Sequence, residues 1–187
     1  MGEVKFMGKA IKINLIKAEG EYDYTKSRLF GSPLVPESWE DRFNEDIIFF
    51  GQINLKEIAH LDVNNKLPHS GYLYFFLDTE VYPYTAWVEH YDGEVRMIID
   101  DFNDAEPLFA HLNKAYLMEF EAVEDDYDGN KLFGIPSGQY DEDCDLLLQF
   151  DPLDTSTGFL EEIDGYAYFF FGKEKPIDNA YFVIDRS

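Results

Sequence analysis

Apolar and polar residues alternate in two stretches of the chain that lie about a hundred positions apart. The apolar positions are Ile11, Ile13 and Leu15 in the first stretch and Tyr116, Met118 and Phe120 in the second. Successive side chains of a β-strand point to opposite faces, so a period of two is typical of a strand with one buried face. Each stretch is therefore predicted to form a half-buried strand, and a shift of 103 positions brings their apolar faces into phase.

Longer apolar runs, rich in aromatic residues, follow in both parts of the chain. They occupy residues 47–51, 72–76, 146–148 and 166–170. Where both faces of a strand are apolar, both faces have to be covered, so the two aromatic runs are predicted to form central strands. Helix signals are few, and the sequence therefore predicts a mainly β fold, a β roll with a few short helices.

Two short segments carry those helix signals. Asn54 followed three positions later by Glu57 matches a capping box, and Asn103 or Asp104 is a candidate start for one or two turns. Neither segment is long enough to change the fold class.

The two parts of the chain also share four sequence blocks in the same order, and Arg28 aligns with Lys131. The blocks pair residues 29–33 with 132–136, 47–52 with 146–149, 71–76 with 165–170, and 97–100 with 182–185. The shift falls from 103 to 85 along the chain, and every loss lies between blocks, as expected for loops. We therefore predict a single domain, residues 1–187, built from two pseudo-symmetric tandem copies of one β unit. Copy one spans about 9–100, a connection 101–113, and copy two about 114–187.

Two glutamines occupy equivalent places in the two copies. Gln52 and Gln149 each end a buried strand just before a turn. An unsatisfied amide in a core costs about 1–3 kcal/mol, so each side chain must find partners. We expect each amide to tie the following loop to a neighbouring strand. Contact with a ligand is the alternative, which makes both glutamines candidate binding residues.

Two tryptophans lie in segments that copy two does not share. Trp39 and Trp87 are expected in loops or edge segments. Tryptophan is enriched where protein interfaces carry most of their binding energy, so both are candidate surface anchors.

An acidic run at residues 125–130 has the spacing of a calcium loop, with Asp126, Asp128 and Asn130 at alternating positions. The match then fails, because Lys131 stands where such a loop needs glycine and Ser137 where it needs a bidentate glutamate. A solvated turn is the simpler interpretation, and these three residues are only weak metal candidates. We expect no cofactor.

The charge of the chain is strongly negative. Lys and Arg number 15 against 38 Asp and Glu, which gives a formal net charge of -23. Such a surface repels nucleic acid and anionic lipid, while it attracts a basic protein or simply keeps the protein soluble. No apolar run approaches the roughly 20 residues of a membrane helix. The single cysteine, Cys144, allows no internal disulfide, and we expect a cytoplasmic location.

Several of these segments together resemble a known family. They are Phe30-Gly31-Ser32-Pro33 leading to Trp39, residues 49–55, Leu67-Pro68 before 71–76, and 146–151 followed by 165–171. In them the chain resembles the YwqG-like family, a bacterial domain of unknown function also labelled DUF1963. It departs from the family pattern at Glu40, where proline is usual, and at 159–162, where a Trp-rich glycine turn is usual. The resemblance implies a mainly β roll and supplies no activity or catalytic residue.

The leading hypothesis is a non-enzymatic binding or interaction protein. Its acidic, aromatic-edged surface would receive a basic protein partner by electrostatic complementarity, for example in an immunity-like role. The alternative is a small-ligand-binding protein or a hydrolase-type enzyme that uses the cleft between the two copies. No catalytic residue and no oligomeric state is predicted.

Overall fold

The computed structural model describes residues 10–44, 46–99, 114–138, 145–151, 165–174 and 176–185. The expected connection 101–113, with Asn103 and Asp104, lies outside these residues, as does Cys144. Below, residues 10–99 are called the N-terminal half and residues 114–185 the C-terminal half.

Among the described residues, 43% lie in β-strands and 7% in two short helices, which confirms the mainly β prediction. In the N-terminal half the strands are β1 (Ala10–Lys17), β2 (Arg28–Leu29), β3 (Leu34–Val35), β4 (Ile47–Asn54), β5 (Tyr72–Asp78), β6 (Thr85–Tyr91) and β7 (Met97–Ile98). The helices of this half are the 3₁₀ helix η1 (Glu37–Arg42) and α1 (Leu55–Ile58). In the C-terminal half the strands are β8 (Tyr116–Val123), β9 (Lys131–Leu132), β10 (Leu146–Phe150), β11 (Tyr166–Phe170) and β12 (Tyr181–Asp185).

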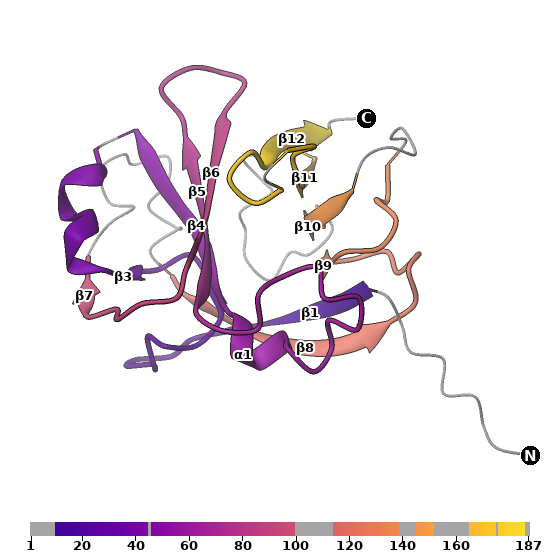
Figure 1. Cartoon of the computed structure of the whole chain (residues 1–187), viewed down its shortest axis with the longest axis horizontal. Helices are drawn as coiled ribbons and strands as arrows, with labels where there is room; N and C mark the ends of the chain where they lie inside the picture. The colour runs from indigo at the N-terminus through magenta and orange to yellow at the C-terminus, as the bar shows by residue number, and fades with distance from the viewer. Residues whose placement is uncertain are drawn as a thin grey trace, which may run out of the picture.

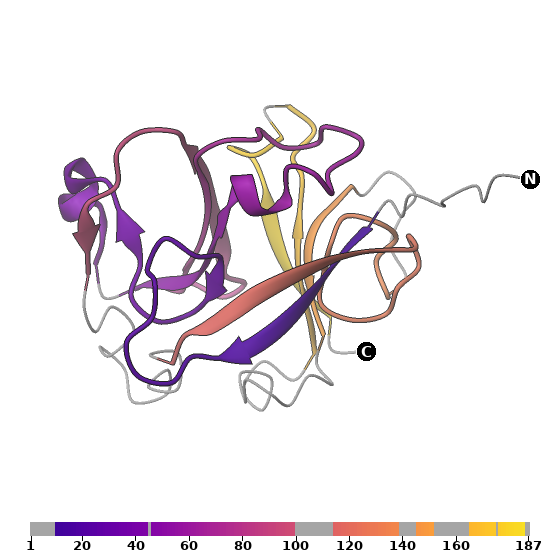
Figure 2. The same ribbon diagram turned by 90° about the horizontal axis from the view of Figure 1, so that it is seen from below.

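Ten of the strands form one antiparallel sheet in the order β12-β11-β10-β9-β1-β8-β2-β4-β5-β6, and β3 pairs with β7 separately. At the centre, β1 and β8 pair along their whole lengths and lie side by side in Figures 1 and 2. The first strand of each half thus joins the strands of the other half. β1 pairs with β9 and so joins β9–β12 in the sheet, while β8 pairs with β2 and so joins β2 and β4–β6.

β1 and β8 are the first strands of the two halves, and their residues occupy corresponding places when the numbering is shifted by 105 positions. The alternating sequence pattern had been aligned with a shift two positions smaller. The backbone N–H of Ile13 donates to Asn130 O at 2.8 Å, and that of Met118 donates to Ser27 O at 3.0 Å. Ile13 therefore corresponds to Met118 rather than to Tyr116. A slip of two residues leaves every side chain on the same face, so alternation alone does not distinguish the two registers.

The sheet curves around one apolar core to which both halves contribute. Phe50 lies 5.1 Å from Phe169 and 6.0 Å from Phe150 between ring centroids, and Phe75 also lies 5.1 Å from Phe169. The edge strands β6 and β12 approach one another and nearly close the sheet. No backbone hydrogen bond joins them among the described residues 85–91 and 181–185. The closure therefore rests on side-chain packing, and we call this junction of the two halves the seam.

Aromatic side chains also cover the outer face of the sheet. In the N-terminal half, η1 and the β3–β7 pair lie over this face (Figure 1). The buried residues there are Val35, Trp39, Phe49, Tyr74 and Phe76, and a smaller cluster of Leu146, Tyr168 and Phe170 covers the C-terminal half. Both faces of β5 and β11 are therefore buried, as expected for central strands.

Helix α1 starts at the predicted place but is capped differently. The Asn54 side chain accepts a hydrogen bond from Lys56 N at 3.2 Å. Glu57, however, accepts from Ser27 N at 3.1 Å and so holds the loop before β2 instead of completing a capping box. Neither this helix nor η1, the two in the described part of the chain, is long and apolar enough to cross a membrane.

Candidate functional site

Arg28 is fully buried and organises the loop around β2. Its Nη1 donates to Tyr24 O at 2.7 Å and to Lys26 O at 3.3 Å, and its Nη2 donates to Ser32 O. The guanidinium carbon also lies 5.5–5.7 Å from three ring centroids, those of Tyr22, Tyr24 and Phe49. Burial lowers the pKa of Arg28, and the carbonyls and ring faces compensate the lost hydration. We call Arg28, Gln52 and residues 22–34 the Arg28 hub.

Lys131 takes the corresponding place in the C-terminal half and is also fully buried. Its Nζ donates to Ile135 O at 2.5 Å, to Asp125 O at 3.5 Å and to Tyr127 O. Burial lowers the pKa of Lys131, while the charges of nearby aspartates, Asp128 foremost, oppose that shift. We call Lys131, Gln149 and residues 125–137 the Lys131 hub.

The two glutamines complete the hubs. Gln52 Nε2 donates to Tyr24 O at 3.0 Å and to Lys26 O at 3.3 Å, and its Oε1 accepts from Leu34 N at 3.3 Å. Gln149 Nε2 donates to Gly129 O at 2.9 Å and to Ser137 Oγ at 2.7 Å, and its Oε1 accepts from Ser137 N at 2.9 Å.

These bonds differ from the prediction in one respect. Each amide holds the loop on either side of β2 or β9, not the loop that follows its own strand. Both side chains are 0% exposed and bonded within their own hub. The structure therefore gives Gln52 and Gln149 a role in fixing the loops and does not bring them together in a cleft.

Trp39 is not on the surface, which corrects its expected role as a surface anchor. The side chain is 5% exposed because η1 lays it against Tyr74 on the outer face of the sheet, with ring centroids 5.2 Å apart. Trp87 is partly buried on β6 and stacks on Phe76 at 4.6 Å. Arg42 lies over both indoles, 4.8 Å and 5.2 Å from the ring centroids. A cation of the chain itself therefore already contacts the faces of these two rings.

The three weak metal candidates do not share one site in the structure. The Oδ1 of Asn130, which is buried, accepts from Asp151 N at 2.7 Å. The Oδ1 of Asp128 accepts from the Tyr166 hydroxyl at 2.9 Å, and Asp126 is exposed. Among the described residues, no group of three or more His, Cys, Asp or Glu side chains is placed to hold a metal ion.

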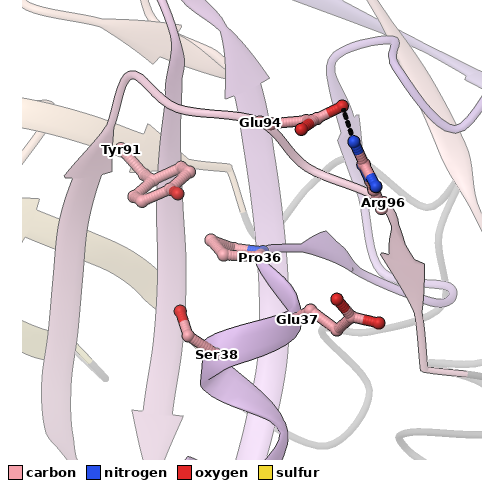
Figure 3. A pocket seen from close by; sticks show the side chains of 6 residues that line it. All are labelled: Pro36, Glu37, Ser38, Tyr91, Glu94 and Arg96. Carbon is pink, nitrogen blue, oxygen red and sulfur yellow. Dashed lines mark ion pairs between the residues drawn. The ribbon is translucent and has the colours of Figure 1, made fainter.

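A polar pocket of about 370 Å³ opens beside the start of η1 (Figure 3). Its described lining is Pro36, Glu37, Ser38, Tyr91, Glu94 and Arg96. Arg96 Nη2 pairs with Glu94 Oε1 at 2.6 Å, and that hydrogen bond raises the pKa of Arg96. Both side chains are about two thirds exposed, so the pair contributes little stability and water competes for every group. The described lining contains carboxylates and a hydroxyl but no histidine or cysteine.

A second pocket, of about 240 Å³, lies in the seam and is apolar. It is lined by Tyr82, Pro83 and Tyr84 at the tip of the β5–β6 hairpin and by Phe182, Val183 and Ile184 of β12. The seam pocket lies between the two halves, where the alternative hypothesis expected a cleft. Its six described lining residues include neither a carboxylate nor either glutamine.

Exposed apolar residues lie on the two segments that line the seam pocket. Val81 is 68% exposed, Tyr82 60% and Tyr181 41%, and the Tyr181 ring stacks on that of Phe170 with centroids 5.3 Å apart. We call these three exposed residues and the seam-pocket lining the seam surface. Exposed apolar residues that cluster in one place, rather than singly, mark interaction sites.

The two segments that form the seam are acidic. Residues 78–91 and 176–185 contain Asp78, Glu80, Glu89, Asp178 and Asp185 but no lysine or arginine, and Lys173, Lys175 and Arg186 flank the second segment in the sequence. One of these carboxylates, Glu89, pairs with Arg42 at 2.9 Å. The segments of the seam therefore combine apolar surface with acidic charge.

Sequence reasoning missed the burial of Arg28 and Lys131, which organise the two hubs. A usable signal was present, because a cation precedes Leu-Phe-Gly in both halves of a chain with only 15 lysines and arginines. The seam surface had no comparable signal, since β6 and β12 are brought together only by the curvature of the whole sheet.

The chain has no significant match among curated proteins or solved structures. A family model, described as a domain of unknown function, matches residues 27–180, which include β2 to β11, Arg28, Gln52 and the whole Lys131 hub. The chain therefore belongs to the DUF1963 family.

Proposed function

We propose that this protein is a non-enzymatic binding protein that receives a basic protein partner on its seam surface. The observation that carries the proposal is that exposed apolar side chains and acidic residues lie on the same two segments of the seam. Val81, Tyr82 and Tyr181 supply contact area, while the carboxylates of residues 78–91 and 176–185 supply the charge. Charge complementarity of this kind selects partners and speeds their encounter.

The same charge argues against a second copy of this chain as the partner. Each chain has a formal net charge of -23, so two chains that meet at their acidic seams repel one another. A partner with clustered lysine and arginine gains from the same field. An immunity-like role, in which the acidic chain neutralises a basic protein, is one form that this function would take.

The alternative of a small-ligand protein or hydrolase-type enzyme in the cleft has less support. Pockets for small molecules usually have volumes of about 300–1,000 Å³ and a few converging polar groups. The seam pocket has about 240 Å³ and an apolar described lining. The polar pocket is larger, but it belongs to the N-terminal half alone and not to the cleft.

Affinity capture with three forms of the protein tests the proposal. The wild type is compared with a seam variant, Glu80→Lys with Asp178→Lys, and with a control variant, Glu19→Lys with Glu21→Lys. The control makes the same charge change on exposed residues of the loop between β1 and β2. Lysate of the native cell is applied at low ionic strength, and bound proteins are eluted with rising salt and identified.

A basic protein that elutes with salt, is retained by the control variant and is lost from the seam variant would support the proposal. A partner that both variants retain equally would place the interface elsewhere. If the wild type captures no salt-sensitive basic protein, the proposed function is wrong.

A further inference from the structure

The seam pocket is too small for most small-molecule ligands but has the size of a single large side chain. Its volume of about 240 Å³ lies below the usual range of about 300–1,000 Å³ for small-molecule sites. Protein interfaces, by contrast, place their strongest anchors in small, well-packed pockets. The dimensions therefore favour one residue of a protein partner as the occupant.

The floor of the pocket is held in place by the common core. Phe182 is 9% exposed, and its ring centroid lies 5.0 Å from that of Phe169 and 6.5 Å from that of Phe50. The floor therefore does not need to reorganise when the pocket is filled, which lowers the cost of binding.

The hairpin wall of the pocket is aromatic and partly exposed. Tyr82 and Tyr84 meet edge to face, with ring centroids 5.7 Å apart and planes at 82°. Tyr82 is 60% exposed, so a side chain inserted beside it would cover apolar surface that water now contacts. Aromatic walls of this kind favour an aromatic or branched aliphatic occupant.

We propose that the basic partner inserts one large apolar side chain, flanked by lysine or arginine, between the hairpin tip and β12. This inference rests on the proposed function and names how the partner is recognised. The pocket takes the apolar anchor, and the acidic segments on either side take the flanking cations.

Synthetic peptides test the inference without knowledge of the natural partner. The probe is the capped pentapeptide Lys-Lys-Phe-Lys-Lys, compared with Lys-Lys-Ser-Lys-Lys and Glu-Glu-Phe-Glu-Glu. Dissociation constants and binding sites are read from amide chemical shifts of the labelled full chain at low and high salt. We expect the Phe probe to shift the amides of Val81, Tyr82, Tyr84 and residues 182–184, and the Ser analogue to bind at least about 10-fold more weakly. The Glu analogue should not bind at low salt.

A matched pair of protein variants completes the test. Tyr82→Ser removes a pocket wall that is 60% exposed, and Ile135→Ser removes a side chain that is 59% exposed on the loop after β9. We expect Tyr82→Ser to weaken binding of the Phe probe at least about 5-fold and Ile135→Ser to leave it unchanged, with both variants folded by circular dichroism.

The outcomes separate the inference from the proposed function. Equal binding of the Phe and Ser probes overturns the apolar anchor but leaves a basic partner possible. Selective binding of the Phe probe at residues 81–84, with no basic protein captured from lysate, supports the anchor pocket and overturns the proposed function. Shifts confined to other parts of the chain overturn the inference.

Discussion

The Arg28 hub and the Lys131 hub hold their loops through the same positions with different cations. Arg28 bonds the carbonyls of Tyr24 and Ser32, and Lys131 bonds those of Tyr127 and Ile135, which stand 103 positions further on. Both positions are fully buried. Both hubs therefore contain a buried positive charge that is surrounded by backbone carbonyls.

The side chains around each hub explain why the cations differ. Arg28 has ring faces around it, including Phe49, and a planar guanidinium packs well on such faces. The residue that aligns with Phe49 in the C-terminal half is Leu146, which offers no ring. There the compact ammonium of Lys131 satisfies three carbonyls as a point charge. The comparison teaches that a buried cation occupies both positions, while its shape follows the neighbours.

The largest expected effect comes from removing the buried charges, with Arg28→Met and Lys131→Met. Each change leaves several loop carbonyls without their donor, and a buried unsatisfied group costs about 1–3 kcal/mol, so we expect each variant to lose about 3 kcal/mol of unfolding free energy. Urea denaturation measures the loss. Lys26→Met is the control, because Lys26 forms a surface ion pair with Glu57 and its loss should cost at most about 1 kcal/mol. A loss below 1 kcal/mol in only one hub would show that the hubs are not equivalent.

The sequence predicted those features of the fold that depend on local pattern. The aromatic runs became the buried strands β5 and β11, and the two glutamines proved to be buried at the predicted positions. Periodicity and the cost of burying an unsatisfied amide are local arguments, so they needed no knowledge of the partner strands.

Features that depend on distant parts of the chain were not predictable in this way. The exchange of β1 and β8 between the halves pairs residues about a hundred positions apart. Alternation also left open which residues of the two strands correspond. Trp39 became buried only because η1 lies over the outer face of the sheet. The common origin of the two halves stays a prediction, which the matching hubs make worth testing.

Glycine substitutions sharpen the comparison with effects of the same size or smaller. Gly31 and Gly134 have φ of +73° and +81°, and a Cβ on each would lie 2.9 Å from the Cβ of Ala115 or Ala10. At Gly134 the nearest atom is the backbone oxygen of Asp125 at 2.5 Å, which cannot move aside easily, whereas at Gly31 it is the hydroxyl end of the Tyr22 side chain at 2.7 Å. We therefore expect Gly134→Ala to cost about 3 kcal/mol and Gly31→Ala about 2 kcal/mol.

Gly20→Ala is the control for this series. Gly20 has a similar φ of +70° with nothing within 4 Å of an added Cβ, so it reports the backbone cost alone, about 1 kcal/mol. Thermal and urea unfolding of the three variants give the order. Equal losses at all three positions would show that the close contacts in the hubs are easily relieved.

The smallest expected effect tests a group that only the Lys131 hub has. A hydrogen bond from Ser137 and a second from Tyr166 lower the pKa of Asp128, whereas the aligned position in the Arg28 hub is Thr25, which has no carboxylate. An acid whose folded pKa is depressed stabilises the fold above its ordinary pKa, about 3.9, and this stability is lost as the pH falls through the folded value.

We therefore expect Ser137→Ala to raise the pKa of Asp128 toward its ordinary value, and Tyr166→Phe to raise it less, because the Ser137 bond is the larger cause. Carboxyl carbon titration by NMR measures both changes. Asp23, whose pKa is lowered by hydrogen bonds from Thr25, is the internal reference and should not move. If Asp128 titrates identically in all three proteins, its two hydrogen bonds do not lower its pKa. If the expected order is found, these two bonds add acid-sensitive stability to the C-terminal loop, beside that which the hydrogen bonds of Asp23 give the N-terminal loop.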